Sequence, residues 1–165
     1  MSKSMNMLAS AVILAGGMVI SSVAQADDIV GTWRLLSLAE QETGSGIIHN
    51  PLGEHPLGLI TFTGDGHMAF IMAGASRKAA ASVQATDAEA AALYRTMAAY
   101  SGTYDLDGDK LTNHPEVAWN QAWNGTDLHR IAAISGSTLT LTTAPFISPF
   151  FGKEIVSTLV FERLR

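Results

Sequence analysis

The sequence predicts an all-β protein in which about eight antiparallel strands form a closed barrel or a strongly bent sheet, with one short α-helix. Three observations carry this prediction. Short runs of β-branched, aromatic or alternating residues follow one another along the chain. Tight glycine and aspartate turns separate them, as at Gly64-Asp65-Gly66 and Asp107-Gly108-Asp109. Only one segment, which begins near Thr86, has the start signal and the composition of a helix.

The N-terminal residues 1–26 have the features of a secretory signal peptide. Lys3 gives a weakly basic start, residues 7–20 are apolar, and Ala24-Gln25-Ala26 fits the small-x-small cleavage rule. The apolar run is too short to span a bilayer well. We therefore expect cleavage after Ala26 and a periplasmic or secreted protein without stable membrane insertion, in which residues 27–165 form one barrel domain. An uncleaved N-terminal anchor is the alternative.

Charge and cysteine content exclude several classes of function. The chain has 15 acidic against 10 basic residues and no basic run, so we expect no nucleic-acid partner. It has no cysteine, which excludes disulfides and a lipid-modified N-terminus. None of the five histidines is spaced for a local metal site, so we expect no metal and no cofactor. The acidic turn at residues 105–109 lacks the glycine and distal glutamate of a calcium loop. The oligomeric state is left open.

The first strand is expected over residues 30–40. Gly31 lets the chain enter it without side-chain conflict. Trp33 either plugs one end of a closed sheet or is an ordinary core residue. Regular alternation would give one face made of Trp33, Leu35, Ser37 and Ala39, and an opposite face made of Arg34, Leu36, Leu38 and Glu40.

The clearest hairpin spans residues 58–72 and turns at Gly64-Asp65-Gly66. On its return strand, Met68, Phe70 and Met72 share one face. Methionine side chains repack easily, so this stripe suits the wall of an adaptable apolar cavity. Plain core packing is the alternative.

The helix is expected to open with a capping box between Thr86 and Glu89 and to run over residues 88–99. Leu93, Met97 and Tyr100 would then share one stripe at helical spacing. Such a helix is either a lid over one end of the barrel or a structural buttress.

The rest of the chain reads as further strands over residues 101–106, 110–114, 127–135, 137–143 and 153–165. Two connections are unusually aromatic. Residues 115–125 carry Trp119 and Trp123, and residues 144–152 carry three phenylalanines. The three phenylalanine rings either pack under the sheet or line the rim of an opening.

These segments together resemble the bacterial and fungal lipocalin-like domain family, over about residues 29–165. The resemblance is carried by an ordered set of motifs: GTWRL at 31–35, FTGDGHM at 62–68, YSGTY at 100–104, WNGT at 123–126 and LTLTT at 139–143. It implies an up-and-down barrel around a cavity for a small hydrophobic molecule. It also implies structural roles for Gly31 and Trp33, with Arg163 or Arg165 packed over the indole. The chain departs from the pattern at His67, where many relatives have tyrosine.

The candidate ligand-binding residues are Phe62, Met68, Phe70, Met72, Tyr104, His114, Trp119, Trp123 and Arg130. His114 is either a general base or ligand partner, or a rim histidine with a structural hydrogen bond. Arg130 would bind a ligand carboxylate or enolate if its strand face points inward, and would be a solvated charge if it points outward.

Three hypotheses for function follow. The first is a carrier of a small hydrophobic or amphipathic molecule. The second is an isomerase, cyclase or hydratase that uses His114 and Arg130 in one pocket. The third is a structural module whose barrel is filled by its own side chains.

Overall fold

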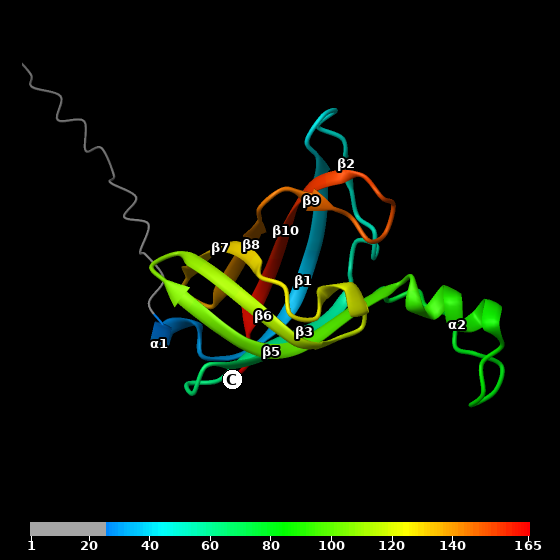
Figure 1. Ribbon diagram of the computed structural model, residues 1–165, viewed down its shortest axis with the longest axis horizontal. Coiled ribbons are helices and arrows are strands. Elements are labelled where there is room, and N and C mark those ends of the chain that lie inside the picture. Colours follow the sequence, from blue (N-terminus) through cyan, green and yellow to red (C-terminus); the bar gives the residue numbers. More distant parts are fainter. Residues whose placement is uncertain (1–25) are drawn as a thin grey trace, which may run out of the picture.

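The structure is a computed structural model that describes residues 26–165 (Figure 1). The predicted signal peptide lies outside the described residues, except for its last position. Within residues 26–165, no helix has the length and apolar character needed to cross a membrane.

Eight long strands form a closed antiparallel barrel, as the sequence predicts. Each pairs with its neighbour in the chain, and β1 closes the ring by pairing with both β3 and β10. Short β2 and β9 pair with β1 and β10. The long strands are β1 (Gly31–Glu42), β3 (Leu57–Phe62), β4 (His67–Ala73), β5 (Met97–Asp107), β6 (Lys110–Ala118), β7 (Leu128–Ser135), β8 (Thr138–Thr143) and β10 (Glu154–Arg163), with β2 at Ile48–His49 and β9 at Phe146–Ile147. The helical segments are α1 (Ala26–Ile29), α2 (Asp87–Tyr94) and the 3-10 turn η1 (Gln121–Trp123).

Trp33 closes one end of the barrel. It is fully buried, and its Nε1 donates a hydrogen bond of 2.8 Å to the carbonyl oxygen of Ile29. The Arg163 guanidinium lies over the indole, 4.0 Å from the ring centroid, and donates to the carbonyls of Val30 and Asp28. Trp33 is thus a core residue at this end of the barrel, and the residue packed over its indole is Arg163 rather than Arg165.

The expected alternation along β1 is correct only as far as Leu35. A bulge lies between Leu35 and Ser37, and it leaves Leu36 exposed by 43%. One extra residue in a strand moves every later side chain to the opposite face. Leu38 and Glu40 therefore face the interior, whereas the prediction placed them with Arg34 on the other face.

The predicted helix begins correctly and ends too late. The Thr86 hydroxyl accepts from the Glu89 amide and the Glu89 carboxylate accepts from the Thr86 amide, which is the expected capping box. The helix stops at Tyr94, however, because the chain from Met97 onward pairs with β4 as strand β5. The helical stripe that would include Met97 and Tyr100 does not exist.

Helix α2 projects away from the barrel and buries none of its residues (Figure 1). Its ring contact with the barrel is Tyr94, which stacks on Trp119 with centroids 4.3 Å apart. In this arrangement α2 does not cover the barrel end as a lid.

Strand β6 is longer than expected and takes residues 115–118 from the predicted connection. The pairing of β5 with β6 shifts register at this point: Ser101 pairs with Val117 and Gly102 with Pro115, so Glu116 is an extra residue in β6. Gly102 faces the β6 backbone so closely that an added Cβ would lie 2.0 Å from the carbonyl oxygen of His114. Only glycine fits this approach between the two backbones.

Candidate ligand-binding cavity

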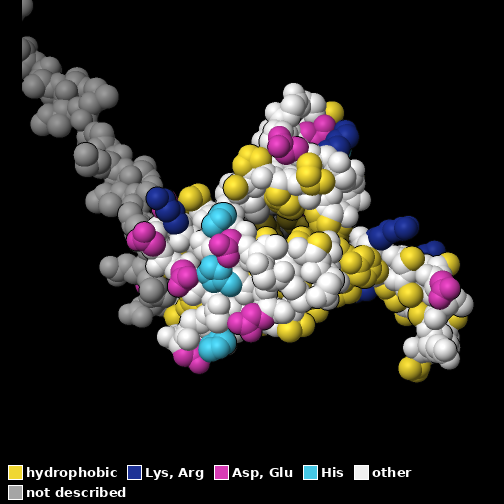
Figure 2. Space-filling model, viewed as in Figure 1, with side chains coloured by type: hydrophobic (Ala, Val, Ile, Leu, Met, Phe, Trp, Pro, Cys, Tyr) yellow, Lys and Arg dark blue, Asp and Glu magenta, His cyan; other side chains and the backbone are white. Residues whose placement is uncertain are grey.

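A cavity of about 400 Å³ lies inside the barrel, toward the end opposite Trp33. Glu40, on its wall, is seven positions after Trp33 along β1, or roughly 20 Å at the usual rise of a strand. Figure 2 looks into a hollow whose visible walls are mostly hydrophobic. The lining residues come from β1, β4, β5, β7, β8 and β10, the η1 turn and the loop that contains β9.

Apolar side chains of the strands form much of the wall. They include Leu38 of β1, Phe70 and Met72 of β4, and Leu159 of β10. Met68 shares the strand face of Phe70 and Met72 but does not line the cavity, because it lies deeper in the core, near the closed end. The stripe thus divides: Phe70 and Met72 form cavity wall, whereas Met68 is packed in the core.

The aromatic loop at residues 144–152 forms another part of the wall. Phe146 and Phe150 line the cavity, whereas Phe151 packs on His49 with ring centroids 4.5 Å apart. Of the two alternatives for these rings, lining an opening applies to Phe146 and Phe150, which face the cavity.

Of the two tryptophans in residues 115–125, one lines the cavity and the other does not. Trp123, in η1, lines the cavity and contacts Tyr100 edge-on with centroids 5.9 Å apart. Trp119 lies behind it, between Trp123 and the ring of Tyr94, and does not line the cavity.

Phe62 and Tyr104, which the sequence also nominated, lie outside the cavity wall. Phe62 is buried near the closed end and contacts Tyr104 edge-on at 4.9 Å. The Tyr104 hydroxyl donates to the carbonyl oxygen of Thr63. Both residues are in structural positions.

Arg130 faces the interior of the barrel. The sequence did not show whether its strand face points inward or outward. Arg130 lines the cavity, and its guanidinium carbon lies 5.8 Å from the centroid of the Tyr100 ring. Its Nη1 donates to the carbonyl oxygen of Leu128 at 3.1 Å. Within residues 26–165, no carboxylate is close enough to form an ion pair with it.

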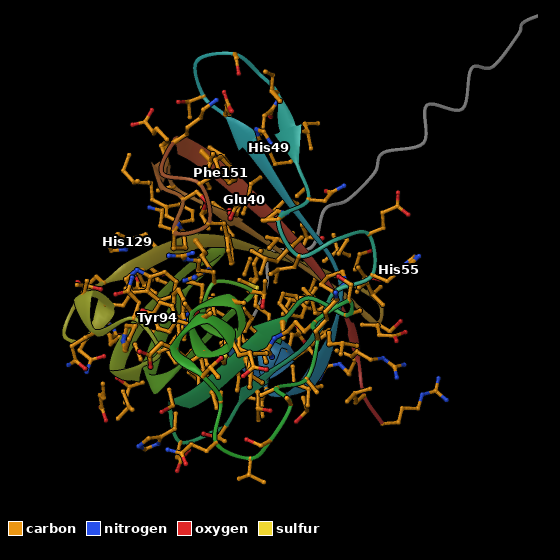
Figure 3. All side chains as sticks on the ribbon, turned by 90° about the vertical axis from the view of Figure 1, so that its right-hand side faces the viewer. Glu40, His49, His55, Tyr94, His129 and Phe151 are labelled. Carbon is orange, nitrogen blue, oxygen red and sulfur yellow. The ribbon has the colours of Figure 1, made fainter. Side chains whose placement is uncertain are left out.

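Glu40 is one of the cavity residues that sequence reasoning did not nominate, and it carries a buried carboxyl group. It is 1% exposed, and its two oxygens accept from the hydroxyls of Ser148 at 2.7 Å and Ser157 at 3.4 Å. Figure 3 shows it near the loop that carries Phe151. Burial raises the pKa of the Glu40 carboxyl, and the two serine hydrogen bonds only partly oppose that effect. Glu40 comes two residues after Leu38, so the sequence does show that the two side chains share a strand face. The bulge at Leu36, which turns that face toward the interior, is not visible in the sequence.

His114 does not line the cavity. Its Nδ1 lies 2.7 Å from Oδ1 of Asp127, and its Nε2 lies 3.0 Å from Oδ2 of Asp105. The hydrogen bond to Asp127, then that to Asp105, raises the pKa of His114. The neighbouring Asn113 points into the barrel instead, as strand alternation requires. The expected meeting of His114 and Arg130 in one pocket is therefore wrong, and with it the enzyme mechanism built on that pair.

Among residues 26–165, no cluster of three or more histidine or acidic side chains is arranged to hold a metal ion. The polar residues in the cavity lining include Glu40, Ser157, Thr143, Arg130, His129 and Asp127. The site is thus an apolar chamber with a few polar points, which is the usual composition of a small-molecule site.

Comparison with known proteins agrees with this geometry. A model of the lipocalin-like domain family matches residues 30–164, which is nearly all of the described chain. A comparison with curated proteins found no match.

Proposed function

Because the chain belongs to the lipocalin-like domain family, we propose that it binds a small, largely hydrophobic molecule inside its barrel. The observation that carries the proposal is the cavity of about 400 Å³ with Phe70, Met72, Phe146 and Phe150 in its wall. Pockets for small ligands usually enclose about 300–1,000 Å³, so the chamber is large enough for one such molecule. A module filled by its own side chains would leave no space of this size.

The proposal also includes the cellular location of the protein. Residues 1–26 support export to the periplasm or the medium, where the barrel would meet its ligand. Mass spectrometry of the protein recovered from its native host tests this part. We expect a mature N-terminus at Asp27, and an intact Met1 would contradict export by cleavage.

Binding is tested with the neutral probe N-phenyl-1-naphthylamine, whose fluorescence rises in apolar surroundings. We expect saturable binding with one probe per chain. Trp123 lines the cavity, so its emission should change on binding. A probe that binds weakly and without saturation would contradict the proposal.

A pair of neighbouring substitutions locates the site. Met72 lines the cavity, whereas Ile71 is 50% exposed on the outer face of the same strand. Met72→Trp should fill part of the chamber and weaken probe binding at least tenfold. Ile71→Trp adds the same ring outside and should leave binding unchanged. Equal effects of the two variants, with both shown to be folded by circular dichroism, would place the probe elsewhere.

A further inference from the structure

Arg130 is a permanent cation in the wall of a largely apolar chamber. Its contacts with the Leu128 carbonyl and the Tyr100 ring satisfy only part of a guanidinium, which carries five N–H donors. Arg130 is partly buried, and a cation that is partly withdrawn from water is more stable with a counter-ion than without one. An anion that enters the cavity would be such a counter-ion.

The carboxyl groups around the cavity do not supply that counter-ion. Glu40 is held by Ser148 and Ser157, and Asp127 is held by His114. The strand register shows how far apart Glu40 and Arg130 are. Glu40 pairs with Ser157, the Ser157 amide donates to Oγ1 of Thr143, and Thr143 pairs with Arg130. The two residues therefore lie at one level of the barrel, three strand spacings apart, or about 14 Å along the wall.

We propose that the ligand is an amphipathic monocarboxylate, whose apolar body occupies the chamber and whose carboxylate pairs with Arg130. This inference rests on the proposed function and names the class of molecule that the same cavity takes. The planar guanidinium matches a carboxylate with two parallel hydrogen bonds. Arg130 carries a single positive charge without an ion-pair partner among the described residues, so we expect a ligand with a single negative charge. Glu40 lies about three strand spacings from Arg130, with its two oxygens hydrogen-bonded to Ser148 and Ser157, so it is not placed against an anion held by Arg130.

The test compares two competitors that share a chain length and differ in charge. Decanoate and 1-decanol are each titrated against bound N-phenyl-1-naphthylamine at pH 7.5 and below their micellar range. We expect the wild-type chain to bind decanoate at least tenfold more tightly than 1-decanol. Equal affinities would overturn the inference and leave the proposed function standing, whereas failure of the neutral probe itself to bind would overturn the proposed function.

Substitutions then assign the preference to Arg130. Arg130→Gln should weaken decanoate at least tenfold more than it weakens 1-decanol, so that the preference for the acid is lost. Arg130→Lys keeps the charge without the planar pair of donors and should fall between. Arg95→Gln, at the exposed end of α2, is the matched control and should change nothing. A preference for decanoate that persists in folded Arg130→Gln protein would assign the anion site to another group. If neither variant at position 130 folds, the acid-against-alcohol comparison in the wild-type chain still decides the ligand class.

Discussion

The guanidinium of Arg163, at the end of β10, lies 4.0 Å from the centroid of the Trp33 ring near the start of β1. These are the two strands whose pairing closes the barrel. The same guanidinium donates to the carbonyls of Val30 and Asp28, in the segment that leads into β1. One side chain thus joins the N-terminal segment, the indole that closes the barrel and the last strand. Gly31 leaves it room, because a Cβ there would lie 3.0 Å from Nη1 of Arg163.

Arg163→Ala should lower the free energy of unfolding by about 2–4 kcal/mol, because it removes a cation–π contact with the buried Trp33 ring and two charged hydrogen bonds. Arg163→Lys should lose less. The measurement is urea unfolding followed by tryptophan fluorescence. Arg165→Ala is the control, since that exposed arginine was the other candidate in the sequence, and it should leave stability unchanged. Equal losses in the two alanine variants would show that the contact over Trp33 adds nothing.

Gly102→Ala should destabilise the barrel by about 1–3 kcal/mol or prevent folding, because the new methyl group would press on the β6 backbone. Gly64→Ala is the matched control in the β3–β4 turn, where an added Cβ meets nothing within 4 Å and φ is not positive. Thermal unfolding by circular dichroism measures both. A Gly102→Ala variant as stable as the wild type would mean that β5 and β6 separate here at little cost.

His114 should make stability depend on pH above neutrality. The pKa of His114 is raised from 6.5, first by Asp127 and then by Asp105, so the folded state holds this proton more firmly than the unfolded chain does. The resulting stability is fully present below about pH 6.5 and is lost as pH rises through the folded-state pKa. We expect an effect below about 1 kcal/mol, because both carboxylates are largely exposed.

Urea unfolding at pH 6 and pH 9 measures this loss. It should be smaller in His114→Gln than in the wild-type chain. His55→Gln, in the loop before β3, should retain the full loss. If His114→Gln keeps the wild-type pH dependence, the two ion pairs do not act on stability.

Glu40 should act in the same direction at lower pH. Burial raises the pKa of Glu40 from 4.5, so the folded state favours the neutral carboxyl. Stability therefore falls as pH rises from about 4.5 through the raised pKa. Glu40→Gln keeps a neutral group of similar shape, and its stability relative to the wild-type chain should improve from pH 4 to pH 7. Glu54→Gln, in an exposed loop, should show no such change. A pH-independent difference for Glu40→Gln would contradict the effect of burial.

Local sequence patterns determined much of the barrel. The turns at Gly64-Asp65-Gly66 and Asp107-Gly108-Asp109, the capping box of Thr86 and the strand expected over residues 137–143 all lie where they were expected. Each depends on interactions between residues close in the chain, so a short window of sequence contains the necessary information. Trp33 at the closed end was also within reach, because the motif around it resembles the start of a known family.

The candidate site depended on tertiary structure. The bulge at Leu36 turned Glu40 inward, and the pairing of Met97 with β4 cut the helix short. Arg130 reached the cavity and His114 did not, although both are on strands whose alternation the sequence shows. Alternation places residues on two faces without saying which face is inside. That choice is made when β1 and β10 pair and close the ring, because closure sets the register between segments more than a hundred residues apart.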